Sequence, residues 1–214
     1  MPSDKAVVHV IDDDEAMRQS LAFLLEAVGM EVQTYESAVA FLEVAPAVKA
    51  GCVITDVRMP GLSGVELLRQ LRERKLGIPV IVITGHGDVP LAVEAMKIGA
   101  MDFLEKPFDD EALVASVRSA LNQLDQDRKR EAERSDIEGR LATLSNRERD
   151  VLQGLVAGLA NKQIAYDLGI SPRTIEIYRA NLMTKMQAAS LSDLVRMALV
   201  AGILGPGPGG PKAS

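Results

Sequence analysis

The first part of the chain alternates between short aliphatic runs and stretches whose apolar residues recur with helical spacing. The aliphatic runs occupy residues 7–11, 53–55, 80–84 and 102–104, and a weaker run at 31–35 alternates polar and apolar residues. Helical spacing follows each of them, over 17–28, 39–42, 65–71, 89–98 and 113–124. This order predicts a strand and a helix repeated five times. Because runs this apolar need cover on both faces, we expect an α/β fold with a doubly wound, five-stranded parallel sheet.

Residues 125–140, DQDRKREAERSDIEGR, are highly charged. Their composition is compatible with a helix, and the apolar repeat fades after Leu124. We expect a helical linker over 125–140 that continues the fifth helix, with a disordered connector as the alternative.

The remainder of the chain has no strand pattern. Apolar spacing predicts one helix over 144–156, a short second helix ended by Gly169, and a third that opens at Ser171-Pro172. A fourth helix is expected after Ser190 or Ser192. The expected buried stripe of the third helix consists of Ile175, Tyr178, Leu182 and Met186. We therefore predict an all-α, four-helix domain over 141–204, and a disordered tail over 205–214 that is rich in Gly and Pro.

Composition narrows the class of protein. A length of 214 residues suits two compact domains. Aromatic residues make up only 3% of the chain, which argues against an aromatic platform for single-stranded nucleic acid. The single cysteine, Cys52, lies in an apolar run and is expected to be a small buried hydrophobe without an internal disulfide. We see no signal segment and no membrane-spanning run, so we expect a cytoplasmic protein that does not contact membranes.

Charge differs between the two parts. Residues 1–142 carry 16 Lys and Arg against 25 Asp and Glu, whereas residues 143–214 carry 8 against 5. The basic part is suited to a polyanion, which would repel the acidic part.

Reactive side chains stand at the predicted ends of different strands. They are Asp12, Asp13 and Asp14 after the first run, Asp56 after the third, Thr84 at the end of the fourth, and Lys106-Pro107 after the fifth. The carboxyl ends of parallel strands share one edge of the sheet, where ligands of α/β folds bind. We therefore expect one pocket that combines carboxylates, a hydroxyl and an ammonium.

These residue types suit phosphoryl transfer to a carboxylate. Clustered carboxylates repel one another unless a cation joins them, and hard oxygen ligands suit Mg²⁺. An aspartate is a possible nucleophile, and a lysine opposite it pairs with phosphoryl oxygens. A phosphohydrolase with an aspartyl nucleophile is an alternative, since Asp12 and Asp14 have the spacing of its paired acids. We do not expect an enzyme that uses ATP, because no Gly-rich loop with Lys-Ser/Thr is found in the sequence.

The pocket residues, together with TDVRMPGLSG (55–64) and EKPF (105–108), resemble the receiver domain of two-component response regulators. The resemblance covers 6–124, and we place the receiver at 1–124. It implies a flavodoxin-like fold in which Asp56 accepts phosphate from a sensor histidine kinase. It also implies a cis Lys106–Pro107 bond. The implied Mg²⁺ ligands are Asp13, Asp56 and the carbonyl of Arg58, with Asp12 acting mostly through water. The implied switch pair is Thr84 and Phe103, where many members have Tyr, so that switching depends on burial of the ring alone.

The segment LSNRERDVLQGLVAGLANKQIAYDLGISPRTIEIYRANLMTKM (144–186) resembles the LuxR/NarL-type helix-turn-helix. Joined to the receiver, it resembles the FixJ/NarL family, near the nitrogen-fixation regulators of rhizobia. Its third helix is expected to enter the major groove of double-stranded DNA. Candidate base-reading residues on its outward face are Glu176, Ile177, Ala180 and Asn181, with Thr184 beside them. Candidate phosphate contacts are Lys162, Arg173, Thr174, Arg179 and Lys185.

The expected function is a phosphorylation-activated transcription activator. Phosphate on Asp56 draws in Thr84 and Lys106 and turns Phe103 inward. The surface of the fourth helix, fifth strand and fifth helix then forms a homodimer that brings two reading helices onto DNA. The alternatives are a phosphate sink without a DNA target and an RNA-binding antiterminator.

Overall fold

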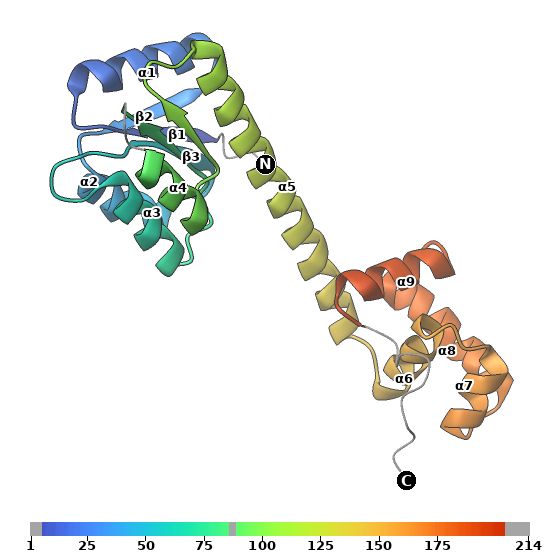
Figure 1. The fold of residues 1–214 in the computed structure, drawn as a ribbon. Helices are drawn as coiled ribbons and strands as arrows, with labels where there is room; N and C mark the ends of the chain where they lie inside the picture. Colours follow the sequence, from blue (N-terminus) through green and yellow to red (C-terminus); the bar gives the residue numbers. More distant parts are fainter. Residues whose placement is uncertain (1–5, 86–88, 204–214) are drawn as a thin grey trace. The chain divides into compact units, whose positions relative to one another are not determined.

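The computed structural model describes residues 6–85 and 89–203 (Figure 1). The chain divides into two compact units, Met1–Asp127 and Arg128–Ser214. His86, which was expected in a loop, and the predicted disordered tail at 205–214 lie outside the described residues. Among those that are described, no helix is both long enough and apolar enough to cross a bilayer.

The first unit is the predicted repeat of strands and helices. Its elements are β1 (Val7–Ile11), α1 (Glu15–Ala27), β2 (Glu31–Tyr35), α2 (Ala38–Val44), the 3₁₀ turn η1 (Ala45–Ala47), β3 (Gly51–Asp56), α3 (Gly64–Glu73), β4 (Val80–Thr84), α4 (Val89–Ile98), β5 (Asp102–Glu105) and the start of α5 (Asp110–Ala142). All strand pairs are parallel, and the sheet order is β2-β1-β3-β4-β5. The prediction of a doubly wound, flavodoxin-like sheet is confirmed.

Helices cover the sheet on both faces, as the apolar strands require. One core contains Leu21 and Leu25 of α1 with Leu113 and Val117 of α5. The other core lies under α2, α3 and α4 (Figure 1). Alternate strand residues belong to the two cores, since successive side chains of a strand point to opposite faces. Cys52 is buried in the first core, as predicted.

Local signals mark where helices begin. Ser63 caps α3 in a capping box with Glu66, and Asp14 accepts the amide of Ala16 at the start of α1. Gly64 opens α3 directly behind the end of β3. A Cβ atom at this position would lie 2.2 Å from the carbonyl oxygen of Asp56, so only glycine allows this close approach.

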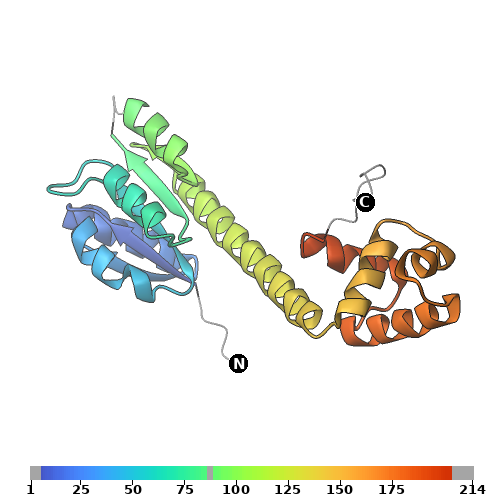
Figure 2. The same ribbon diagram turned by 90° about the horizontal axis from the view of Figure 1, so that it is seen from below.

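The second unit is helical, as predicted, and includes the last turns of α5 (Figure 2). Its other helices are α6 (Asn146–Val156), α7 (Asn161–Leu168), α8 (Pro172–Met186) and α9 (Leu191–Val200). Gly169 ends α7 in the left-handed conformation, and Ser171 caps α8 next to a proline at the first helical position. Of the two serines expected at the start of α9, Ser190 is the one that caps it.

Helix α5 runs without interruption through residues 125–140. Leu113, Val117 and Ala120 pack in the first unit, whereas Ile137 and Leu141 are buried in the core of the second. The apolar repeat fades between these two groups because neither core takes side chains from that part of the helix. The sequence-based start of the helical domain at 141 leaves out Ile137, which the structure places in that core.

Candidate functional site

The carboxyl ends of three strands bring an ammonium between two carboxylates. Lys106, which follows β5, places its Nζ 2.6 Å from Oδ1 of Asp56 at the end of β3. The same Nζ lies 3.5 Å from Oδ2 of Asp12, which follows β1. The peptide bond between Lys106 and Pro107 is cis, as the resemblance implies. The fold thus joins side chains 50 and 94 residues apart in the sequence.

Asp12 is buried and held from both sides. Its Oδ1 accepts the amide of Asp14 at 2.9 Å, and its backbone carbonyl accepts Nη1 of Arg18 at 2.7 Å. Sequence reasoning missed Arg18. Its position one helical turn after Asp14, at the start of α1, was the available signal.

The charges in this pocket change the acidity of its members. Burial raises the pKa of the Asp12 carboxyl above its usual value, and the charge of Asp56 adds to the rise. Burial alone would lower the pKa of the Lys106 ammonium. The hydrogen bond and charge of Asp56, with the charge of Asp12, outweigh burial, so the pKa of Lys106 is raised. Lys106 therefore remains protonated at neutral pH and offsets part of the carboxylate charge.

Asp56 combines a fixed orientation with access from outside. Its Oδ2 accepts the amide of Arg58 at 2.6 Å, while its Oδ1 accepts Lys106. Its side chain is 12% exposed, so part of it is accessible to solvent. These contacts hold the carboxylate in the orientation that a nucleophile in this pocket needs.

The predicted switch residues lie in contrasting positions. Thr84 is buried, and its hydroxyl donates to the carbonyl of Leu104 at 3.5 Å. Phe103 on β5 is 44% exposed, so its ring points out of the fold. Asp102 accepts the amide of Phe103 and also a short hydrogen bond from the Ser116 hydroxyl on α5. The Ser116 hydrogen bond joins the start of β5 to α5.

The oxygen donors fit a hard cation, although they are not gathered around one point. Asp12 and Asp56 both face Lys106, whereas Asp13 is exposed. Within residues 6–85 and 89–203, no three His, Cys, Asp or Glu side chains are close enough to share one ion. The donors are carboxylates with a backbone carbonyl at hand, which is the ligand type that Mg²⁺ prefers.

Helix α8 carries the predicted DNA-reading face on its exposed side. Ile175, Leu182 and Met186 are buried, and Tyr178 is half-buried, as the predicted stripe requires. The residues predicted to face outward are all exposed: Glu176, Ile177, Ala180, Asn181 and Thr184. Ile177 is 57% exposed, so its side chain is accessible to a partner.

Three of the predicted phosphate contacts have partners within the domain. Nη1 of Arg179 donates to Oδ1 of Asn161 on α7 at 2.7 Å. Nζ of Lys185 lies 2.7 Å from Oε2 of the buried Glu148 at the start of α6. Thr174 forms a hydrogen bond with its cap residue, Ser171. The remaining two, Lys162 and Arg173, are exposed.

Glu148 is the centre of a polar cluster that sequence reasoning missed. It accepts the amide and hydroxyl of Ser145 as well as Lys185. The hydrogen bond from Lys185 and those from Ser145 lower the pKa of the Glu148 carboxyl. Glu148 three residues after Ser145 signals the capping box, but nothing local identifies Lys185, which lies 37 residues away.

Two family models match the chain. Residues 8–118 match the response regulator receiver domain. Residues 142–198 match the bacterial regulatory proteins of the luxR family.

Similar proteins cover nearly the whole chain. The transcriptional regulatory protein FixJ of Azorhizobium caulinodans is 63% identical over 92% of this chain and 93% of its own. FixJ of Bradyrhizobium diazoefficiens is 57% identical over 94% and 98%. Among solved structures, full-length FixJ from B. japonicum has a TM-score of 0.60 at 56% identity, covering 94% of this chain and all of its own. The response regulator StyR has a TM-score of 0.79 at 42% identity, covering 91% and 98%.

Members of this family are transcription regulators and are generally not enzymes, and their receiver domains generally bind Mg²⁺. The receiver takes its phosphate from a sensor kinase, and the LuxR-type domain binds DNA. The chain belongs to the FixJ family of two-component response regulators, which regulate transcription under the control of phosphorylation.

Proposed function

We propose that Asp56 is the phosphate acceptor of the receiver. The observation that carries this proposal is the pair of hydrogen bonds that fix its carboxylate, from the Arg58 amide at 2.6 Å and from Lys106 at 2.6 Å. One carboxylate oxygen attacks the phosphorus of the kinase's phosphohistidine as the P–N bond breaks. Lys106 is already in place to pair with the oxygens of the incoming phosphoryl group.

A magnesium ion is the cofactor that this pocket requires. We assign its ligands as the carboxylates of Asp12, Asp13 and Asp56 and the backbone carbonyl of Arg58, with Asp12 acting mostly through water. Bound there, Mg²⁺ offsets the negative charge of the carboxylates and of the phosphoryl group. The raised pKa of Asp12 supports this assignment, because a buried carboxylate gains most from a nearby cation.

Phosphorylation is read by Thr84 and Phe103. The hydroxyl of Thr84 leaves the Leu104 carbonyl, which it meets at only 3.5 Å, and donates to the phosphoryl group. The space that the Thr84 hydroxyl leaves allows the exposed ring of Phe103 to turn inward. This changes the surface of α4, β5 and α5, which then pairs with the same surface of a second chain.

The paired chains place two copies of α8 on one DNA site. Glu176, Ile177, Ala180 and Asn181 face the base edges, and Lys162, Arg173, Thr174, Arg179 and Lys185 are the candidate phosphate contacts. Lys162 and Arg173 are the best supported of these, since both are exposed. Ala180 is short, so each half-site makes few base contacts, and the dimer supplies the remaining specificity.

The proposed setting is the cytoplasm, where promoter DNA and a kinase domain meet, and the proposed targets are nitrogen-fixation genes. The protein does not turn over a substrate of its own, because the phosphoryl group is the signal. Phosphorylated protein mixed with random duplex DNA should select a sequence with two-fold symmetry. Failure to enrich any sequence would favour a phosphate sink instead.

The acceptor role is tested by Asp56→Asn with acetyl phosphate as the phosphate donor. The wild-type protein is expected to dimerise on addition of acetyl phosphate and Mg²⁺, as measured by analytical ultracentrifugation. The variant should remain monomeric, while Glu26→Gln, at an exposed position on α1 outside the proposed dimer surface, serves as a control that dimerises. Dimerisation of the Asp56→Asn variant would overturn the assignment.

The reading helix is tested by gel shifts on the selected sequence with Ile177→Ala and Arg179→Ala. Loss of a base contact at Ile177 is expected to weaken binding about tenfold and to relax the preference at one base pair. Loss of Arg179 should weaken binding to all sequences alike. Unchanged binding by both variants would refute the assigned face of α8.

A further inference from the structure

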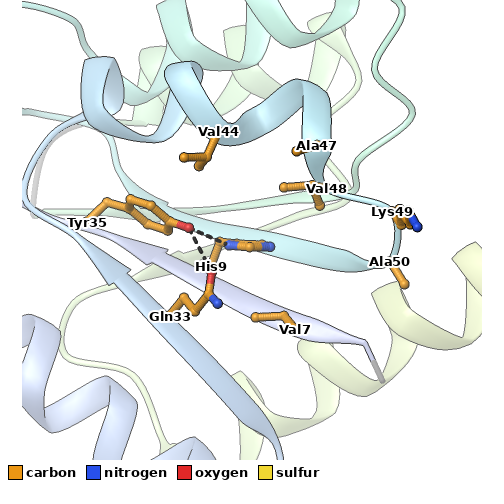
Figure 3. A pocket seen from close by; sticks show the side chains of 9 residues that line it. All are labelled: Val7, His9, Gln33, Tyr35, Val44, Ala47, Val48, Lys49 and Ala50. Carbon is orange, nitrogen blue, oxygen red and sulfur yellow. Dashed lines mark hydrogen bonds between the residues drawn. The ribbon is translucent and has the colours of Figure 1, made fainter. Parts of the chain in front are cut away.

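A second cavity in the receiver lies away from the acidic pocket. It has a volume of about 230 Å³ and lies between the edge of the sheet and the segment that follows α2 (Figure 3). The side chains of Tyr35, Gln33 and His9 come from β2 and β1, and Val44 and Val48 lie opposite them on α2 and the segment after it. Lys49 lies at one end of the lining. The proposed function uses none of these residues.

The imidazole of His9 has one nitrogen in use and one without a partner. The side chain of His9 projects from β1 into this cavity (Figure 3), although the residue is only 4% exposed. Nδ1 lies 3.2 Å from the hydroxyl of Tyr35. Nε2 is buried and has no hydrogen-bond partner among the described residues. Buried polar atoms are rarely left unpaired, so an unpaired nitrogen at a cavity indicates a missing partner.

The hydrogen bonds around His9 decide what kind of partner is missing. The hydroxyl of Tyr35 donates to Oε1 of Gln33 at 3.0 Å, which uses its single proton. The same oxygen therefore accepts the proton on Nδ1 of His9. Burial lowers the pKa of His9, so its imidazole is neutral at pH 7 and carries only that proton. Nε2 is then a bare acceptor, and its partner has to donate a hydrogen bond.

The remaining residues of the cavity indicate the shape and charge of the missing partner. Val44 and Val48 give the cavity an apolar side. The rings of His9 and Tyr35, which also line it, have centroids 5.8 Å apart, and both pack on the buried ring of Phe41. Such surroundings favour a flat, apolar body. Lys49 is exposed and contributes a positive charge to the lining. The volume is below the usual range for drug-sized ligands, which limits the occupant to about one ring with short substituents.

We propose that this cavity binds a small phenolic acid. The phenol hydroxyl donates to Nε2 of His9 once a small movement of the imidazole opens this buried atom to the cavity. The ring of the ligand packs against Val44 and Val48, and its carboxylate is attracted by Lys49. A carboxylate without a hydroxyl lacks the donor for Nε2, and an aliphatic alcohol lacks the flat body. The site shares no residue with the acidic pocket.

The test is titration of the full-length chain, labelled with ¹⁵N in its histidine rings, with 4-hydroxybenzoate. The chain contains two histidines, so His9 reports on the site and His86 serves as an internal control. We expect a saturable shift of the His9 Nε2 resonance, with a Kd of roughly 0.1 to 1 mM for a ligand of this size. The phenol donor is tested with 4-methoxybenzoate, which should bind at least tenfold more weakly.

Two variants locate the binding. His9→Phe should abolish binding of 4-hydroxybenzoate, monitored by isothermal titration calorimetry. Lys49→Met, an exposed position that leaves the fold intact, should weaken 4-hydroxybenzoate about threefold and leave the neutral 4-hydroxybenzamide unchanged. The absence of a saturable His9 shift at 10 mM 4-hydroxybenzoate would overturn the proposal and leave only ordered water as the partner of Nε2. Equal binding of 4-methoxybenzoate would overturn it as well.

Discussion

Asp12 and Asp13 are neighbours in the chain but have opposite surroundings, since Asp12 is buried and Asp13 is exposed. Burial raises the pKa of Asp12, so its ionised form is less favourable in the folded state than in the unfolded one. This cost appears as pH rises above the unfolded pKa of about 4 and is complete above the raised folded pKa. Without Mg²⁺ at pH 7, Asp12→Asn is expected to increase the free energy of unfolding by on the order of 1 kcal/mol.

Urea denaturation of the two variants measures this difference. Asp13→Asn is the matched control and should change the free energy of unfolding by less than about 0.5 kcal/mol. The gain from Asp12→Asn should shrink as the pH approaches 4, where the unfolded carboxyl is itself protonated. A variant no more stable than wild type at pH 7 would contradict the assigned cost of the buried charge.

Lys185 and Lys162 were both predicted to contact phosphates, and the structure separates them. Lys185 is paired with the buried Glu148, whereas Lys162 is exposed. Lys185→Met should lower the free energy of unfolding of the DNA-binding unit by about 1 kcal/mol, because Glu148 loses its cation. Lys162→Met should leave stability unchanged and reduce the salt dependence of DNA binding by about one phosphate contact. Thermal unfolding measures the stability of both variants, and salt titrations measure their DNA binding. A loss of stability in Lys162→Met but not in Lys185→Met would contradict the prediction.

Two glycines in helices test how closely the elements pack. A Cβ at Gly154 of α6 would lie 2.8 Å from Cγ1 of the buried Ile164 on α7, while a Cβ at Gly139 of α5 meets nothing within 4 Å. Gly139→Ala should therefore stabilise the chain by about 0.5 to 1 kcal/mol, through helix propensity alone. Gly154→Ala should destabilise it by about 1 kcal/mol or more, because the buried side chain of Ile164 would have to shift. Equal effects in denaturation experiments would show that α6 and α7 are not tightly packed.

The last part of α5 is expected to contribute to the stability of the second unit. Ile137 is buried in the core of the second unit, although it lies in the segment predicted to be a linker. A fragment of residues 128–204 should fold, and one of residues 141–204 should be less stable by about 2 to 5 kcal/mol, the cost of losing a large buried side chain. In the full chain, Ile137→Ala should show a similar loss, and Ser135→Ala, at an exposed position, serves as control. Thermal melts followed by circular dichroism would measure the stability of all four proteins. Equal stability of the two fragments would contradict the prediction.

The elements also show what local sequence predicts. Ser37, Ser63 and Ser145 cap helices through bonds to residues three positions away, so their signals are short and readable. The strand-end pocket was predictable because parallel topology alone brings strand ends to one edge. The pairs Lys185 with Glu148 and Arg179 with Asn161 were not predictable, since they depend on how α6, α7 and α8 cross. Ile137 was missed because one apolar residue within a charged segment has no periodicity.

At the scale of the whole molecule, the reading surface is too small to act alone. The outward face of α8 offers the short side chain of Ala180 between its longer neighbours, and two of the basic residues near it are bonded within the domain. A single copy therefore gains little from bases or phosphates. Joining two copies makes the second contact intramolecular, which increases affinity without any new type of contact. DNA binding should accordingly depend on the dimer.

The receiver surface that makes the dimer can be tested apart from the phosphate chemistry. Met96 on α4 is exposed and close in sequence to the exposed Val93, and Phe103 on β5 is also exposed. Met96→Ser removes apolar area from this surface without touching either core, so the monomer should keep its stability. With acetyl phosphate and Mg²⁺, the variant should be phosphorylated normally but dimerise at least tenfold more weakly, and it should lose DNA affinity in parallel. Phe23→Ser, at another exposed apolar position on α1, is the matched control. Loss of dimerisation in the control, or its retention in Met96→Ser, would assign the dimer to a different face.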